Sequence, residues 1–327
     1  MYKPIIALLI FTAFTIAANA QEKPATATVP AKPSAPETLP GKGLAEHDFF
    51  YAGEGNKVMS IVKQGKVVWS YTDTSKRGEI SDAVLLSNGN VLFARQYGIT
   101  EITPDKKLVW NYNAPAGTEI HTARPIGKHL VLYMQNGNPA MLFVVNIVTG
   151  KTVLELPMAV KNPLSTHGQF RHVSLTDAGT LLVAHMDMDK VSEYDAEGKE
   201  LWTVPVASPW HAIRLKNGNT LITSNKHFVR EVNSKGETVW EFADKDLPDF
   251  KFSGLQTAVR LPNGNTIINN WCRKDDGTGV QAIEVSPDKK LVWALREWTP
   301  PTDLGRSTTI QLLDGPAPEN MHFGALH

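Results

Sequence analysis

The chain has 327 residues, with 33 basic and 33 acidic side chains, so its formal net charge is zero. This balance gives no general electrostatic attraction to nucleic acid, and we expect no nucleic-acid partner. A single cysteine, Cys272, excludes an intramolecular disulfide, so the fold must depend on its apolar core for stability.

The first twenty residues, "MYKPIIALLIFTAFTIAANA", combine one lysine, an apolar run from Ile5 and a small-residue ending. This pattern is typical of a cleavable secretory signal peptide over residues 1–20. A retained membrane anchor is the alternative, but the apolar run is short for a membrane span. No cysteine follows the run as a site for lipid attachment. We therefore expect a periplasmic or secreted protein without a membrane anchor.

Residues 21–43, "QEKPATATVPAKPSAPETLPGKG", are rich in Pro, Ala and Thr and nearly lack large apolar side chains. Such a segment cannot bury enough apolar surface to order itself, so it predicts a flexible linker. By length, residues 44–327 fit two domains or one large all-β domain. The repeats within them favour a single domain.

The first half of the repeat is a strand, a glycine turn and a second strand. Four copies are closely alike: "AVLLSNGNVLFA" (83–94), "VSLTDAGTLLVA" (173–184), "AIRLKNGNTLIT" (212–223) and "AVRLPNGNTIIN" (258–269). A variant, "ARPIGKHLVLY" (123–133), has Gly127 and Lys128 at its bend. The Asn-Gly and Gly-Lys pairs favour tight hairpin turns.

The second half of the repeat is a turn followed by an aromatic strand. Examples are "KQGKVVWSY" (63–71), "TPDKKLVWNY" (103–112), "DAEGKELWTV" (195–204), "NSKGETVWEF" (233–242) and "SPDKKLVWAL" (286–295), while "IVTGKTVLEL" (147–156) has leucine in place of tryptophan. Tryptophans that recur once per unit favour packing between neighbouring units over a platform for sugars. Trp210, Trp271 and Trp298 fall outside this register and are better ligand candidates.

Each unit thus predicts four short strands over about 40 residues, and no long window has helical periodicity. Four-stranded units repeated radially are typical of a β-propeller. Five units are complete, and a sixth is divided between the two ends of the domain: residues 49–71 supply three of its strands and residues 307–316 supply the fourth. We predict an all-β, six-bladed β-propeller of four-stranded antiparallel blades, its ring closed by N- and C-terminal strands. Five or seven blades stay open as alternatives.

Alignment of the units on their glycine turns places six residues at one position, the start of the innermost strand: Asp82, His121, His172, His211, Thr257 and Thr308. Counting across each hairpin gives the residues expected opposite them: Arg95, Met134, His185, Ser224 and Asn270. Because antiparallel partners share an edge, both sets are expected on one rim, at the mouth of the central channel. Arg171 and Trp210 directly precede two of the histidines.

Two interpretations of this rim stay open. Polar residues at a wet channel mouth need only solvate it, and Asp82 and Arg95 would then form an ordinary cross-strand ion pair. Alternatively, convergent imidazoles bind an anion, act in catalysis or hold a divalent metal, with Asp82 as a further ligand. The candidate catalytic residues are His121, His172 and His211. The candidate ligand-binding residues are Asp82, Arg95, Arg171, His185, Trp210, Thr257 and Asn270. The sequence assigns no set of metal ligands.

The segments "VTGKTVLEL", "AEGKELWTV", "SKGETVWEF" and "KQGKVVWSY" resemble the pyrroloquinoline-quinone-like (quinoprotein alcohol dehydrogenase-like) β-propeller repeat, over about residues 44–315. The resemblance implies the fold but not the quinone, since outer-membrane assembly scaffolds with this repeat bind none. Quinone-dependent dehydrogenases of the group have eight blades and usually adjacent cysteines. Six units and one cysteine therefore predict that pyrroloquinoline quinone is not the cofactor.

The segment "HAIRLKNGN", from His211 to Asn219, also resembles the inner strands of bacterial arylsulfate sulfotransferases, which are secreted six-bladed propellers. That resemblance implies a channel histidine as nucleophile, with further His and Arg residues holding the sulfuryl group. His211 matches best, while His172 and His121 match more loosely. The chain lacks the additional N-terminal domain and much of the length of those enzymes.

Two functions follow from these observations. The first is a non-catalytic propeller that binds a small molecule, a glycan or a protein at the channel mouth. The second is a histidine-dependent lyase, hydrolase or group transferase at the same mouth, with or without a metal, in which Arg95 or Arg171 neutralises an anionic substrate. We favour the first, because the enzymatic interpretation needs more coincidences.

Overall fold

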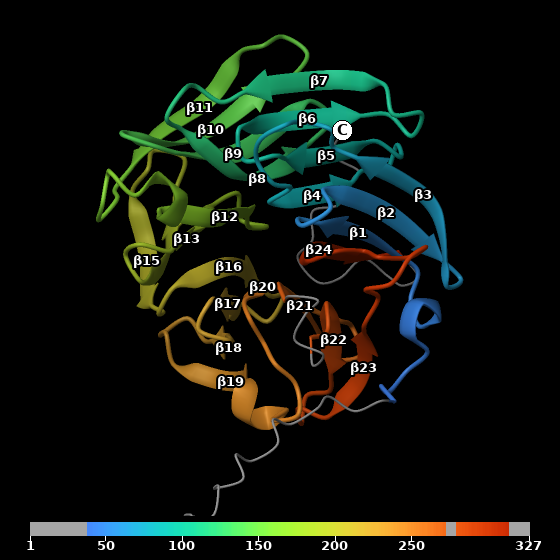
Figure 1. The fold of residues 1–327 in the computed structure, drawn as a ribbon. Coiled ribbons are helices and arrows are strands. Elements are labelled where there is room, and N and C mark those ends of the chain that lie inside the picture. Colours follow the sequence, from blue (N-terminus) through green and yellow to red (C-terminus); the bar gives the residue numbers. More distant parts are fainter. Residues whose placement is uncertain (1–37, 273–278, 314–327) are drawn as a thin grey trace, which may run out of the picture. The chain divides into compact units, whose positions relative to one another are not determined.

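The computed structural model describes residues 38–272 and 279–313. Within them, six four-stranded antiparallel sheets follow one another around a ring (Figure 1). The predicted six-bladed propeller is therefore confirmed. The predicted signal peptide and most of the predicted linker lie outside the described residues and stay predictions. The described part of the chain contains no helix with the length and hydrophobicity that a membrane crossing requires.

The blades follow one another in chain order, and the four strands of each blade run from the innermost strand outward. Blade 1 contains β24 (Ser307–Leu312), β1 (Phe49–Gly53), β2 (Val58–Lys63) and β3 (Lys66–Thr72). Blade 2 contains β4 (Asp82–Leu85), β5 (Val91–Ala94), β6 (Gly98–Ile102) and β7 (Leu108–Asn113). Blade 3 contains β8 (Glu119–Ile126), β9 (Leu130–Asn136), β10 (Ala140–Asn146) and β11 (Thr152–Met158). Blade 4 contains β12 (Phe170–Leu175), β13 (Leu181–His185), β14 (Lys190–Tyr194) and β15 (Glu200–Pro205). Blade 5 contains β16 (Pro209–Arg214), β17 (Thr220–Ser224), β18 (Phe228–Val232) and β19 (Thr238–Ala243). Blade 6 contains β20 (Leu255–Arg260), β21 (Thr266–Asn270), β22 (Ala282–Val285) and β23 (Leu291–Leu295).

The ring closes as the sequence predicts, because the C-terminal strand β24 pairs antiparallel with β1. The glycines of the innermost hairpin turns adopt positive φ angles, for example +85° at Gly89 and at Gly218, which explains the Asn-Gly pairs. The described residues also contain three short 3₁₀ helices. η1 (Gly43–Ala45) precedes β1, η2 (Thr166–Gly168) lies between β11 and β12, and η3 (Asp244–Asp246) lies between β19 and β20.

The repeated tryptophans join neighbouring blades. Three of them donate the indole N–H to a backbone carbonyl in a turn of the next blade, over 2.8–2.9 Å: Trp69 to Pro104, Trp202 to Ser234 and Trp240 to Pro287. Trp293 of the last blade is fully buried and donates to Gly43, ahead of β1, over 2.8 Å. Apolar side chains of adjacent blades fill the space between them, as in the cluster that joins Ile213 and Phe242 of blade 5 to Ile268 and Ile283 of blade 6. The predicted packing role fits these contacts.

The innermost strands are irregular at their beginnings. In β8, β12, β16, β20 and β24, a β-bulge near the start places one extra residue opposite the partner strand. A β-bulge changes the direction in which nearby side chains point. Here the bulges lie at or beside the aligned position at the start of the innermost strand in five of the six blades. The expected cross-strand partners are wrong. His185 faces Phe170 and Asn270 faces Leu255, in each case beside a bulge. Asp82 faces Ala94 in the β4–β5 hairpin, which has no bulge but whose register differs by one residue from the expected pairing.

Candidate ligand site at the channel mouth

The starts of all six innermost strands meet around a small recess. It holds about 10 Å³, the space that one water molecule needs. Its lining residues are Glu54, Glu79, Ser81, His121, Arg171, His172, Trp210, Gln256 and Thr308. Each blade contributes at least one of them, so the recess depends on closure of the complete ring.

A wider cleft adjoins the recess and shares Glu54 and Glu79 with it. The cleft holds about 610 Å³, a volume typical of small-molecule sites. Its other lining residues are Gly55, Asn56, Lys57, Gly78, Trp298, Asp303, Gly305 and Arg306. A small molecule in the cleft can therefore extend one group into the recess, past the two shared carboxyl groups.

Arg171 and Trp210 form the polar wall of the recess. The guanidinium carbon of Arg171 lies 4.6 Å from the centre of the Trp210 ring, a cation–π contact. Arg171 is 5 % exposed, yet within the described residues its Nε and Nη1 have no hydrogen-bond partner, and neither has Trp210 Nε1. Buried N–H groups rarely stay unpaired, because leaving one without a partner costs about 1–3 kcal/mol. These donors are open to an acceptor from outside the protein, either a water molecule or an oxygen of a ligand.

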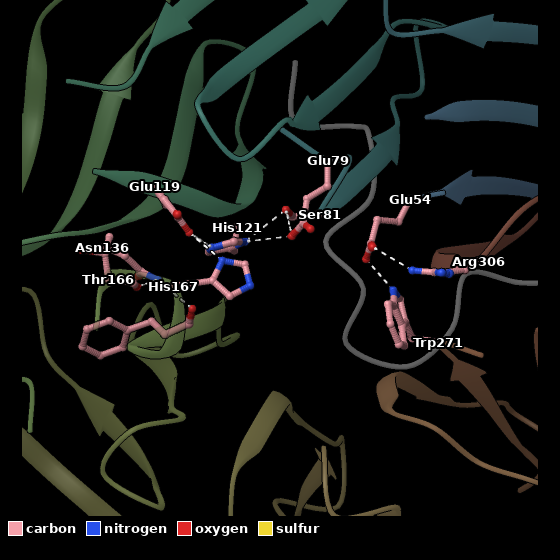
Figure 2. Close-up of polar contacts among 11 residues, drawn as sticks. Glu54, Glu79, Ser81, Glu119, His121, Asn136, Thr166, His167, Trp271 and Arg306 are labelled. Atoms are coloured by element: carbon pink, nitrogen blue, oxygen red, sulfur yellow. Dashed lines mark hydrogen bonds and ion pairs between the residues drawn. The ribbon is translucent and has the colours of Figure 1, made fainter. Parts of the chain in front are cut away.

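Glu54 lies across the mouth from Glu119 and His121 (Figure 2). Trp271 Nε1 donates a hydrogen bond to Glu54 Oε2, and Arg306 Nη1 lies 3.8 Å from Glu54 Oε1. Burial raises the pKa of Glu54 to about 7, and the negative charge of nearby Glu79 acts in the same direction. Glu54 can therefore release or accept a proton near neutral pH, as a general acid or base must.

His121 links the recess to a second carboxylate (Figure 2). Its Nδ1 lies 3.1 Å from Ser81 Oγ, which donates to Glu79 Oε1, also over 3.1 Å. Its Nε2 lies 2.9 Å from Glu119 Oε2, the same oxygen that lies 2.8 Å from His167 Nδ1. Burial lowers the pKa of His121 to about 3, so the ring is neutral near pH 7.

The other two candidate histidines lie with a buried ion pair. Arg124 Nη2 donates to Asp82 Oδ1 over 2.9 Å, and Thr122 Oγ1 donates to Asp82 Oδ2 over 3.0 Å. His172 Nδ1 lies 3.8 Å from Asp82 Oδ2, and the His172 and His211 rings meet edge to face with centres 5.0 Å apart. Burial lowers the pKa of His172 well below its usual range and the pKa of His211 to about 3. Both are neutral, so neither readily accepts a proton at pH 7.

The structure brings together most of the side chains that the repeat register selected. His121, Arg171, His172 and Trp210 line the recess, and Asp82 and His211 contact His172. Thr257 is buried beside Gln256, which lines the recess in its place. The off-register tryptophans also lie at the mouth, because Trp298 lines the cleft and Trp271 bonds to Glu54.

The residues expected opposite them bond within their own blades instead. Arg95 donates to Thr100, Asn111 and Asn113 and does not pair with Asp82. His185 Nε2 lies 2.9 Å from the hydroxyl oxygen of Tyr194. Asn270 donates to the backbone carbonyls of Lys251 and Val280. The bulges in β12 and β20 displace the expected partners of His185 and Asn270. The β4–β5 hairpin has no bulge, and there Asp82 pairs with Ala94, one residue before Arg95.

Several polar residues of the mouth could not be found from the repeat register: Glu54, Glu79, Glu119, Arg124, His167 and Gln256. Glu54 and Glu79 lie in connections between strands, and His167 lies in η2, where the repeat gives no register. One signal was present, because Glu119 and His121 are two apart on a strand and such residues share a face.

Comparisons with known proteins agree with the fold. Residues 159–270 match the family described as outer membrane protein assembly factor BamB, which confirms the predicted PQQ-like repeat for that segment. A crystal structure of a protein of unknown function from Bacteroides caccae is 25% identical, with a TM-score of 0.71, and the match covers 81% of this chain and 97% of that chain. A search of curated proteins finds no match.

Two lyase structures share the fold at lower identity. A streptogramin B lyase is 12% identical with a TM-score of 0.55, over 82% of this chain and 85% of that chain. Virginiamycin B lyase from Staphylococcus aureus is 10% identical with a TM-score of 0.53, over 78% and 85%. At these identities the likeness concerns the fold alone.

Proposed function

We propose that this β-propeller, which carries the PQQ-like repeat in residues 159–270, binds a small acidic sugar in the cleft and recess at its channel mouth. One observation carries the proposal. The buried N–H donors of Arg171 and Trp210 have no protein partner among the described residues and line a recess beside an open cleft. The predicted signal peptide places this binding outside the cytoplasm, in the periplasm or the medium.

The donors select a negatively charged or strongly accepting oxygen. Nε and Nη1 of Arg171 can each donate a charge-assisted hydrogen bond to an anionic oxygen, and Trp210 Nε1 adds another donor. The recess has room for about one water-sized group, so only the end of a ligand fits inside. A carboxylate oxygen at the edge of a larger molecule meets both conditions.

The cleft is suited to the rest of such a ligand. Glu54, Glu79 and Asp303 offer acceptors for hydroxyl groups, and Trp298 lines the same space. Aromatic side chains with polar neighbours suit the mixed apolar and hydroxylated faces of a sugar ring. A hydroxylated carboxylate fits this arrangement better than a purely apolar anion.

Isothermal titration calorimetry with D-glucuronate and D-galacturonate tests the proposal, with D-glucose as the matched neutral sugar. We expect at least one uronate to bind and glucose to bind more than tenfold weaker. The Arg171→Met variant is expected to lose about 100-fold in uronate affinity, since two charge-assisted hydrogen bonds disappear. Arg214→Met, which alters an arginine–tryptophan pair between blades, is the control. Equal binding of glucose and uronates, or full affinity in Arg171→Met, contradicts the proposal.

An enzyme at the same cleft is the second candidate, and Glu54 is the observation that favours it. If Arg171 pairs with the uronate carboxylate, the proton on the adjacent carbon becomes more acidic. The Glu54 carboxylate, with a pKa of about 7, can accept that proton. The electron pair then forms a double bond to the next ring carbon, whose C–O bond breaks, and the leaving oxygen takes a proton from water.

Ultraviolet absorbance of the unsaturated product tests this elimination, with oligogalacturonate and oligoglucuronate as substrates. Turnover is expected to disappear in Glu54→Gln while uronate binding persists. Absence of any product from either substrate, together with uronate binding, leaves the binding function and removes this second candidate.

A further inference from the structure

We infer that Glu119, His121 and His167 form a binding site for a divalent transition-metal ion. One carboxylate oxygen and two imidazole nitrogens of these residues all lie within 4.8 Å of one another. The three side chains converge from two elements, since Glu119 and His121 come from β8 and His167 comes from η2 (Figure 2). The site is separate from the donors of Arg171 and Trp210, and the inference does not depend on the proposed function.

The spacing of the three atoms fits a metal ion with little rearrangement. Glu119 Oε2 lies 2.9 Å from His121 Nε2 and 2.8 Å from His167 Nδ1, and the two rings meet edge to face with centres 5.0 Å apart. Zinc binds imidazole nitrogen and carboxylate oxygen at about 2.0–2.2 Å. Small outward shifts of the two nitrogens make room for an ion bonded to all three atoms.

The atoms that face away from the site are already held. His121 Nδ1 lies 3.1 Å from Ser81 Oγ and 3.6 Å from Glu79 Oε1, which fixes the ring with Nε2 toward Glu119. A ligand histidine typically uses its second nitrogen in this way, to a carboxylate or hydroxyl partner.

The turn that carries His167 is also held in place. Asn136 Nδ2 donates to the carbonyls of Thr166 and Phe170, over 3.0 and 3.1 Å, and Gln169 is bonded to the backbone of Gly137. His167 itself has a side chain that is 54 % exposed. An exposed histidine paired with a carboxylate adds little stability, but it gives an ion from solvent a path to the site.

The donor set favours zinc or a similar ion over calcium or magnesium, which prefer oxygen ligands. Three protein ligands leave a position for water or a bound molecule, as in catalytic zinc sites. Since His121 also lines the recess, an ion here lies next to the ligand that we propose for the cleft. The ion therefore contributes positive charge beside Arg171.

Titration of chelator-treated, untagged protein with Zn²⁺ alone tests the inference, followed by calorimetry and by the visible spectrum after substitution with Co²⁺. We expect one ion per chain, and the Co²⁺ spectrum of a low-coordinate site with nitrogen and oxygen ligands. His167→Ala and Glu119→Gln are expected to weaken Zn²⁺ binding by more than about 100-fold, beyond the loss typical of an outer-shell change. His129→Ala, which alters an exposed histidine in the β8–β9 turn, is the control.

No binding of Zn²⁺ to the wild type, or equal affinity in His167→Ala and Glu119→Gln, overturns the inference. His167 is exposed, so its replacement is expected to leave the fold intact, and near-ultraviolet circular dichroism checks this. The result is distinct from the test of the proposed function, because uronate binding to metal-free protein still depends on Arg171. Wild-type protein that binds Zn²⁺ but binds neither uronate contradicts only the proposed function.

Discussion

The same pair of side chains, an arginine over a tryptophan ring, occurs in two regions with different surroundings. Between blades 4 and 5, Arg214 lies 5.1 Å from the centre of the Trp202 ring, pairs with Glu193 and donates to Thr220. Trp202 Nε1 donates to the carbonyl of Ser234. At the channel mouth, Arg171 lies 4.6 Å from the Trp210 ring, with N–H groups that have no partner among the described residues.

The difference separates a pair that stabilises the contact between two blades from a pair that we propose binds a ligand. The contact between Arg214 and Trp202 satisfies its polar atoms. Arg260 and Trp240 form a similar pair between blades 5 and 6, in which Arg260 Nη2 pairs with Glu231 but Arg260 Nε has no partner among the described residues. The mouth leaves N–H groups of Arg171 and Trp210 and Nδ1 of His211 without a partner among the described residues, which lowers stability. Proteins accept such local losses at sites that bind or transform a ligand. The following substitutions test this contrast, from the largest expected effect to the smallest.

His211→Phe is expected to reduce the sensitivity of the fold to acid. Burial lowers the pKa of His211 to about 3, so between pH 6.5 and 3 the unfolded chain binds a proton that the folded chain excludes. The free energy of unfolding therefore has its full value above pH 6.5. It falls as the pH is lowered, by up to about 1.4 kcal/mol per pH unit and roughly 4–5 kcal/mol in all. Urea unfolding between pH 8 and pH 4 measures the slope. His129→Phe, at an exposed position, should leave the slope unchanged, and an unchanged slope in His211→Phe contradicts the assignment.

The architecture was predictable because it rests on local, repeated signals. Asn-Gly pairs mark the innermost hairpins, the tryptophans mark the outermost strands, and the fragments at both ends predict the closing strand β24. These signals also aligned His121, His172 and His211 across blades. Rotation about a common axis brings equivalent positions together, so their meeting near the mouth followed from register alone.

The details of the mouth were not predictable because they depend on departures from the repeat. Bulges displace the expected partners of His185 and Asn270, and a one-residue difference in the β4–β5 register places Ala94 and not Arg95 opposite Asp82. All three side chains make hydrogen bonds elsewhere. Blade 3 lacks the Asn-Gly turn, and its Arg124 reaches Asp82 in the neighbouring blade. Glu54 and Glu79 lie in connections, whose conformation no periodic pattern describes. Sequence periodicity gives the frame, whereas local irregularity decides which side chains reach the ligand.

Glu54→Gln is expected to stabilise the protein at alkaline pH. The pKa of Glu54 is about 7 in the folded protein and near 4.5 in the unfolded chain. The neutral carboxyl group therefore contributes fully to the free energy of unfolding below pH 4.5, and this contribution is lost as the pH rises through 7. Glutamine cannot ionise, so at pH 8 the variant should unfold with up to about 3 kcal/mol more free energy than wild type. The two should differ little at pH 4.

Glu193→Gln supplies the control from the contact between blades, because Glu193 pairs there with Arg214. Removal of its charge should lower stability by about 1 kcal/mol at pH 8. Urea denaturation at pH 4, 6 and 8 measures both variants. A lower unfolding free energy for Glu54→Gln at pH 8 would show that the ionised carboxylate is stabilised in the fold.

Arg171→Met and Arg214→Met are expected to change stability in opposite directions. Methionine is close to arginine in length, and at position 171 it removes a buried charge with unpaired N–H groups, so the unfolding free energy should rise by about 1–3 kcal/mol. At position 214 the same change leaves the Glu193 carboxylate without its partner and should lower the unfolding free energy by about 1–2 kcal/mol. Guanidinium denaturation at pH 7 measures both. A parallel loss in the two variants contradicts the contrast between the regions.

The smallest expected effect comes from replacing each tryptophan of the two pairs with phenylalanine. Trp202→Phe loses the hydrogen bond to the Ser234 carbonyl and should lower the unfolding free energy by about 1 kcal/mol. Trp210→Phe loses an N–H that has no partner among the described residues and keeps an aromatic ring beside Arg171, so stability should change less than in Trp202→Phe. Uronate affinity should respond in reverse, falling about tenfold in Trp210→Phe and staying unchanged in Trp202→Phe. If Trp210→Phe keeps full affinity, Trp210 Nε1 is not a ligand contact, and Arg171 alone supplies the donors of the recess.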